Sequence, residues 1–129
     1  MRILFFAILL CLATSCLKEN SNYVKLTGPV NISQALIPDT SVNMENIQIS
    51  ARAMETNACW KNLRFVLSKV NDFEYELEAY GTYESYGNCP EMMVYNDTLI
   101  DFKPTKTGTY IFHVTKTPYK IENDTLIVR

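Results

Sequence analysis

The stretch "DFEYELEAY", residues 72–80, shows the clearest two-residue period in the chain. Its apolar side chains all fall on one face: Phe73, Tyr75, Leu77 and Ala79. The acidic side chains fall on the other: Glu74, Glu76 and Glu78. Because successive side chains of a strand point to opposite faces, this pattern predicts a half-buried β-strand. Asn71-Asp72 is a turn signal, so residues 63–70 and 73–82 are expected to form a hairpin.

Similar runs recur along the rest of the chain. The segment "ENIQISARAM", residues 45–54, places its apolar residues on one face: Ile47, Ile49, Ala51 and Ala53. Three later runs, at 98–102, 108–115 and 124–129, are rich in β-branched and aromatic residues and are separated by turn-forming residues. No long helical period occurs beyond the N-terminus. About seven strands of this kind predict an all-β sandwich.

The segment "IDFKPTKTGTYIFHV", residues 100–114, carries a family resemblance. It resembles the late strands of Ig-like β-sandwich domains and, more narrowly, of small flavobacterial-type lipoproteins of the Bacteroidota. The resemblance implies an Ig-like sandwich of about seven antiparallel strands, with Tyr110 in a tyrosine corner that bonds to backbone upstream. Phe112 stands where antibody domains carry their second cysteine, so the antibody disulfide is not expected.

The N-terminus reads as an export signal. Arg2 is followed by 11 apolar residues, Ile3 to Ala13, a length typical of a signal-peptide core and too short to span a bilayer. Small residues then precede Cys16, which predicts a cut before that cysteine. The site resembles a bacterial lipobox, with Ala13 and Ser15 where Leu and Gly or Ala are usual. That resemblance implies lipidation of Cys16.

The predicted organisation is therefore a lipoprotein signal peptide at 1–15, a tether at 16–22 and one domain at 23–129. Several acyl chains on one cysteine would hold the domain at a membrane, because each buried methylene contributes about 0.8 kcal/mol. Lys18-Glu19 resembles the lysine-plus-acidic signal that sends Bacteroidota lipoproteins to the cell surface. The alternative is an ordinary solvated start of a tether.

Cysteine usage agrees with export. The chain has four cysteines, of which Cys11 leaves with the signal and Cys16 is the lipidation site. A disulfide is predicted between the remaining two, Cys59 and Cys89, in an oxidising compartment. Closing a loop of about 30 residues is worth roughly 3–4 kcal/mol in the chain-entropy model. A metal pair is disfavoured, because no second ligand pair flanks either cysteine.

Charge argues against a nucleic-acid partner. Without Arg2 the mature chain has 11 basic and 14 acidic residues, a net charge near −3. The lysines and arginines are scattered rather than clustered, so no electrostatic footprint for nucleic acid is present.

No catalytic constellation, cofactor motif or metal site is recognisable. His113 is the single histidine, and alternation puts it on the opposite face of its strand from Tyr110 and Phe112. No G-x-S-x-G elbow or phosphate-cradling glycine loop occurs. The acid pair Asp97 and Asp101 would serve a glycosidase only at particular separations. The chain is therefore expected not to be an enzyme.

The row formed by Glu74, Glu76 and Glu78 has two interpretations. One is a site for calcium or a cationic partner, and the other is a solvated face opposite lysines. Alternate strand residues stand about 6.6 Å apart, which is too far for them to chelate one ion alone. Calcium would want about six to eight oxygens from a looped segment.

The segment "AYGTYESYGNCPEMMVY", residues 79–95, is the candidate ligand-binding region. Its tyrosines are interleaved with Gly, Ser and Asn, a palette typical of binding loops: Tyr80, Tyr83, Tyr86 and Tyr95. Met92 and Met93 add a soft apolar surface. The hypothesis is a protein or glycan partner, and the alternative is that the tyrosines cap the core at a sheet end.

These features predict a lipid-anchored, non-catalytic binding or accessory module on the outer membrane, at its periplasmic or cell-surface face. The alternative is an inhibitor of a periplasmic, lysozyme-type enzyme. Small disulfide-bridged β lipoproteins of that kind share this size and anchoring, and their Ser/Gly/Tyr-rich loop is similar to "ESYGN", residues 84–88. A hydrolase is disfavoured by the missing constellation.

Overall fold

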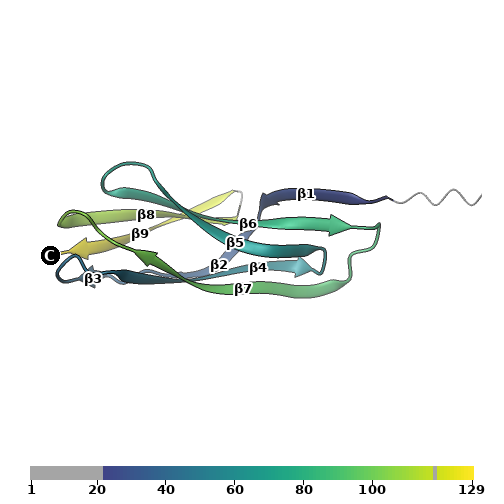
Figure 1. The fold of residues 1–129 in the computed structure, drawn as a ribbon, viewed down its shortest axis with the longest axis horizontal. Coiled ribbons are helices and arrows are strands. Elements are labelled where there is room, and N and C mark those ends of the chain that lie inside the picture. The colour runs from purple at the N-terminus through teal and green to yellow at the C-terminus, as the bar shows by residue number, and fades with distance from the viewer. Residues whose placement is uncertain (1–21, 118) are drawn as a thin grey trace, which may run out of the picture.

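The computed structural model describes residues 22–117 and 119–129, which fold into two packed β-sheets (Figure 1). The predicted signal peptide, the predicted lipidation site Cys16 and most of the predicted tether lie outside the described residues. The described chain forms nine strands: β1 (Val24–Pro29), β2 (Asn31–Leu36), β3 (Thr40–Ser41), β4 (Ile47–Asn57), β5 (Trp60–Lys69), β6 (Glu74–Ser85), β7 (Glu91–Phe102), β8 (Gly108–Thr117) and β9 (Lys120–Val128). The predicted all-β class is confirmed.

The larger sheet has six strands and curls like half a barrel around β6. One edge of β6 pairs with β5 in the predicted hairpin, with Leu67 opposite Leu77. The other edge is shared: β1 pairs with residues 80–85 of β6, and β8 pairs with residues 74–77. The strand β9 follows β8, and the short β3 pairs with β9 at the far edge.

The smaller sheet has three antiparallel strands in the order β2-β4-β7. The chain enters it by changing sheets at Val30, between β1 and β2. The last residue of β1 is Pro29, whose ring nitrogen has no hydrogen to donate to a ladder. The inward residues of β4 are those that the alternation predicted, and each is at most 7% exposed: Ile47, Ile49, Ala51 and Ala53.

The expected set of about seven strands, all antiparallel, is wrong in two respects. The described residues form nine strands, and two of their pairings, β6–β8 and β3–β9, are parallel. The direction of β8 follows from the chain path. The strand β7 lies in the smaller sheet and runs opposite to β6. The turn after β7 reverses the chain again, so β8 runs in the same direction as β6 (Figure 1). Because β1 covers only one half of that edge of β6, the other half is open for β8.

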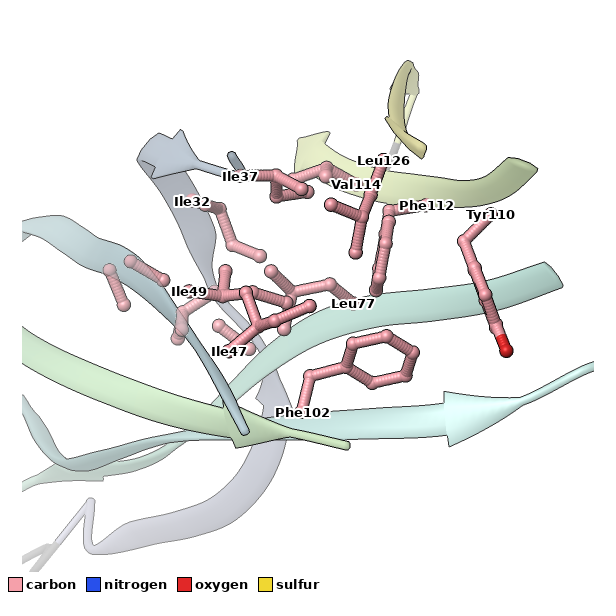
Figure 2. Close-up of a cluster of buried hydrophobic side chains, with 14 of the residues drawn as sticks. Ile32, Ile37, Ile47, Ile49, Leu77, Phe102, Tyr110, Phe112, Val114 and Leu126 are labelled. Carbon is pink, nitrogen blue, oxygen red and sulfur yellow. The ribbon is translucent and has the colours of Figure 1, made fainter. Parts of the chain in front are cut away.

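The core lies between the sheets and is aromatic at one end (Figure 2). The Phe102 ring from β7 meets Tyr110 and Phe112 from β8 edge-on, with centroids 5.4 and 5.1 Å apart. Leu77 and Phe112 are fully buried. Burying a side chain of this size contributes about 1.5–3 kcal/mol to the stability of the fold, so this cluster stabilises the packing of the two sheets.

The tyrosine corner predicted at Tyr110 is confirmed. Its hydroxyl donates to the Lys106 carbonyl oxygen at 2.8 Å and accepts from the Lys106 backbone N–H at 3.1 Å. Gly108 begins β8 at a φ of +145°, where a Cβ would come within 2.8 Å of the Phe73 ring. The turn before β8 therefore depends on a glycine and on the tyrosine that follows it.

Candidate binding surfaces

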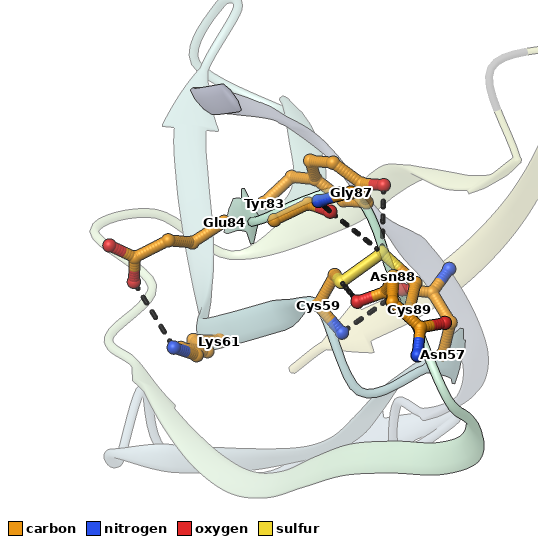
Figure 3. Close-up of a disulfide and its surroundings, with 9 residues drawn as sticks. Asn57, Cys59, Lys61, Tyr83, Glu84, Gly87, Asn88 and Cys89 are labelled. Carbon is orange, nitrogen blue, oxygen red and sulfur yellow. Dashed lines mark hydrogen bonds and ion pairs between the residues drawn. A yellow bond between two sulfur atoms is a disulfide. The ribbon is translucent and has the colours of Figure 1, made fainter. Parts of the chain in front are cut away.

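The predicted disulfide between Cys59 and Cys89 is confirmed, and it ties the loop after β6 to the turn before β5 (Figure 3). The Tyr83 hydroxyl lies 2.9 Å from Cys89 Sγ and donates to it, because a disulfide sulfur carries no proton. The Tyr83 ring meets Trp60 edge-on, with centroids 5.4 Å apart. Gly87 has a φ of +97°, and its N–H donates to Ser85 Oγ at 3.0 Å. The loop is thus held at both ends.

Two tyrosines meet on the outside of this stapled loop. The Tyr23 and Tyr86 ring centroids are 4.8 Å apart, and Tyr86 is 74% exposed. The Tyr23 hydroxyl donates to Glu84 at 2.7 Å, and Lys61 contacts the other oxygen of the same carboxylate at 3.1 Å. The hydrogen bond to Glu84 raises the pKa of Tyr23 to about 12, and the same bond lowers the pKa of Glu84.

An open hollow of about 530 Å³ lies at the same end of the sandwich, where β4 ends and β7 begins. Its lining residues are Thr56, Asn57, Glu91, Met92 and Met93. Both methionines are more than half exposed. We call the exposed apolar surface at this end of the molecule the tyrosine end, and it consists of Tyr23, Val24, Leu26, Tyr86, Met92 and Met93.

A second surface is the outward face of β2-β4-β7, which we call the three-stranded face. The strand register places its residues in three rows: Leu36, Ser50 and Leu99; Gln34, Arg52 and Asp97; Met54 and Tyr95. Three large apolar side chains on this face are strongly exposed: Tyr95 at 64%, Leu99 at 59% and Leu36 at 57%.

An ion pair lies in the middle row of the three-stranded face. The Arg52 guanidinium binds both oxygens of Asp97, one of them at 2.9 Å from Nη2. Its Cζ atom also lies 5.6 Å from the centre of the Tyr95 ring. The hydrogen bond from Arg52 lowers the pKa of Asp97, so this carboxylate is ionised at neutral pH.

The four predicted site tyrosines do not share one surface. Tyr83 points inward beside the disulfide, whereas Tyr80 points outward from the same strand and donates to Glu78 at 3.1 Å. Tyr86 lies on the loop, and Tyr95 lies on the three-stranded face. The physical reason is that residues 79–95 are not one loop. Most of the segment belongs to β6 and β7, and only residues 86–90 connect them.

The acidic row and the histidine lie together on the outer face of the larger sheet. The side chains of Glu74, Glu76 and Glu78 are all half-buried. His113 is half-buried too, with Nδ1 2.8 Å from Asn123 Oδ1 and Nε2 3.8 Å from Glu74 Oε2. Within residues 22–117 and 119–129, no three His, Cys, Asp or Glu side chains come close enough to hold a metal ion.

Sequence reasoning missed the residues that complete both surfaces: Tyr23, Leu36, Arg52 and Leu99. The period of β7 does place Leu99 on the same side as Tyr95, and that signal was readable. Leu36 and Tyr23 could not be found in this way, because each meets its partner only through pairing with a distant part of the chain.

No protein-family model, curated protein or solved structure matches this chain. Over the described ranges, the structure contains no helix of the length and apolarity that crossing a bilayer requires. Function is therefore inferred from the surfaces that the fold exposes.

Proposed function

We propose that this chain is a lipoprotein, anchored through Cys16, that serves the cell envelope as a non-catalytic binding module. The anchor is supported by the export signal and by the cysteine that follows the cut site. The Cys59–Cys89 disulfide supports an oxidising compartment outside the cytoplasm. The three-stranded face is the surface that holds the partner.

The observation that carries this proposal is the exposure of Tyr95, Leu99 and Leu36 on one sheet face. Aromatic side chains, Met and Arg are enriched in protein interfaces, and Tyr and Arg are frequent hot spots. The three-stranded face combines all three residue types over adjacent strands, with Met54 and Arg52 beside Tyr95. Exposed apolar side chains on both sides of a paired charged row support an interaction site on this face.

A protein partner fits this face better than a glycan does. Sugars stack on the open face of an aromatic ring, but the Arg52 guanidinium already lies over the Tyr95 ring. Leu36 and Leu99 offer aliphatic contact area, which apolar side chains of a protein can cover. The paired Arg52 and Asp97 would fix the orientation of the partner rather than supply most of the affinity.

The finer fold assignment is part of the same proposal. We infer a distant relation to Ig-like sandwiches, supported by the tyrosine corner at Tyr110 and by a β2-β4-β7 sheet that packs on a sheet containing the β8-β9 hairpin. The parallel neighbours β6 and β8 depart from the Ig strand order. Such a relation predicts architecture and leaves the partner open.

Site-directed photocrosslinking in cells that export the chain tests the binding module. A benzophenone amino acid at Leu99 is expected to give one discrete adduct with an envelope protein. The matched control is Val66, which is also apolar and exposed but lies on the outer face of the other sheet. Tyr95→Ala should abolish the adduct formed from Leu99, and Val66→Ala should not.

The identity of the adduct separates the two functions predicted from sequence. Capture of a lysozyme-type enzyme, with inhibition by the purified chain, would identify an inhibitor. Capture of another envelope protein would identify an accessory module. Equal adducts from Leu99 and Val66, or none from either, would contradict a partner on the three-stranded face.

Protease treatment of intact cells tests the location. We propose the outer membrane, and digestion of the chain on whole cells would assign it to the cell surface, whereas protection until the envelope is opened would assign it to the periplasmic face.

A further inference from the structure

The proposed anchor would hold one particular end of the molecule near the membrane. The described chain begins beside Tyr86, since the Tyr23 ring packs against that ring at a tilt, with centroids 4.8 Å apart. Tyr23 is the seventh residue after Cys16, and seven residues span at most about 25 Å even when fully extended. Figure 1 shows the chain entering at one end of the elongated sandwich, with the C-terminus at the other. The tyrosine end is therefore the end nearest to the acyl chains.

The side chains at this end suit the boundary between lipid and water. Tyrosine has an apolar ring and a polar tip, and it is enriched where acyl chains meet headgroups. Tyr86 is 74% exposed, and Met92 and Met93 are 59% and 53% exposed. Glu84, the carboxylate beside Tyr23, is already paired with Tyr23 and Lys61. Glu91 beside Met92 and Lys25 beside Val24 are exposed charges, which a hydrated headgroup layer accommodates without burying them.

We propose that the tyrosine end rests on the phospholipid surface, with Tyr23, Tyr86 and Met92 in the headgroup region. The inference rests on the proposed anchoring at Cys16. The sandwich then stands on its end, and the three-stranded face points sideways along the membrane, open to a partner. A short tether gives a high effective concentration of lipid, so weak contacts of a few side chains suffice to hold this orientation.

Methionine oxidation of the unaltered, lipidated chain on phosphatidylcholine vesicles tests the orientation. Met92 is 59% exposed and Met44, near the opposite end, is 41% exposed. Exposure in the free molecule predicts that peroxide oxidises Met92 faster than Met44. If the tyrosine end rests on lipid, the order reverses, and Met92 is oxidised several-fold more slowly than Met44.

Fluorescence quenching by vesicles with brominated acyl chains gives a second readout. Tyr86→Trp and Val70→Trp are compared, each combined with Trp60→Phe so that one tryptophan reports. Val70 is 57% exposed and lies at the turn between β5 and β6, at the other end. The Tyr86→Trp variant should lose most of its emission, and the Val70→Trp variant should lose none.

The outcomes separate the orientation from the anchor. Flotation with vesicles and the mass of the N-terminal peptide establish lipidation first. A lipidated chain in which Met92 is oxidised faster than Met44, or in which both tryptophan variants are quenched equally, overturns the orientation and leaves the anchored module standing. A chain without lipid on Cys16 overturns both.

Discussion

The Tyr110 hydroxyl lies 2.8 Å from the carbonyl oxygen of Lys106, four residues earlier, and donates a hydrogen bond to it. The Tyr110 side chain is fully buried, so this bond joins the turn before β8 to the aromatic core. Phe73 and Phe102 both pack against the same ring, with centroids 5.2 and 5.4 Å away. The turn geometry and the core packing are therefore coupled through one side chain.

The first prediction concerns the hydrogen bond from Tyr110 to Lys106. Tyr110→Phe keeps the ring but leaves the Lys106 N–H and carbonyl without their partner, which should lower the free energy of unfolding by about 1–2 kcal/mol. Urea denaturation followed by Trp60 fluorescence measures it. Tyr119→Phe is the control, because Tyr119 is 98% exposed, and it should leave the midpoint unchanged. Equal midpoints for both variants would show that the corner bond contributes nothing.

The second prediction concerns the disulfide. Replacing Cys59 and Cys89 by serine should lower the free energy of unfolding by about 3–4 kcal/mol, because the unfolded chain regains the entropy of a 30-residue loop. Chemical reduction of the unaltered protein should give the same unfolding midpoint as the double variant. A midpoint that moves with neither treatment would mean that the loop retains its closure without the bond.

The third prediction concerns a close approach at Gly81. A Cβ there would meet Leu63 Cδ2 at 2.7 Å and Val30 Cγ1 at 3.0 Å. Gly81→Ala should therefore cost about 1–3 kcal/mol of stability through overpacking. Gly28→Ala is the matched control on the neighbouring strand, since its nearest atoms would lie at 3.7 Å, an ordinary contact. Equal stability of the two variants would contradict the tight packing at Gly81.

The fourth prediction is a pH dependence that belongs to Asp72. Its carboxylate contacts Lys106 at 2.6 Å and Lys69 at 2.8 Å. The hydrogen bond from Lys106 has the largest effect on the pKa of Asp72 and that from Lys69 the next largest, and together they lower this pKa from 3.8 to about 2. Its contribution to stability is therefore present above pH 3.8 and is lost as the pH falls through about 2. The effect is small and salt-sensitive, because the three side chains are half exposed.

Asp72→Asn should remove this component of the acid dependence. Unfolding midpoints measured at low salt between neutral pH and pH 2 should fall less steeply for the variant than for the unaltered protein. High salt should bring the two curves together. Parallel curves at low salt would show that the two lysines do not stabilise the folded form through this carboxylate.

Local patterns predicted much of this fold. The alternation in residues 72–80 predicted the β5–β6 hairpin and the burial of Leu77 and Ala79. A strand that is covered on one side needs an apolar residue at every second position. The disulfide followed from counting the cysteines that remain once the predicted signal peptide and the predicted lipidation site are set aside. The tyrosine corner followed from a resemblance in which Gly108 and Tyr110 have defined places.

Long-range pairing was beyond the reach of those patterns. A period of two gives the face of a strand but not its neighbour, so the parallel placement of β8 beside β6 was not predicted. The row of Leu36, Ser50 and Leu99 likewise depends on the registers of two strand pairs. The sequence could have predicted in part that the tyrosines lie on different surfaces. Tyr80 and Tyr83 are three residues apart, so in one continuous strand their side chains point to opposite faces.

Intact mass and sequencing of the mature N-terminus test the anchored module most directly. We expect the mature chain to begin at Cys16 and to carry a thioether-linked diacylglycerol and an acylated amino group. A membrane fraction that contains this species supports both proposals. A mature chain that begins elsewhere, or one that begins at Cys16 with an unmodified thiol and amino group, would contradict the anchor and the orientation that depends on it.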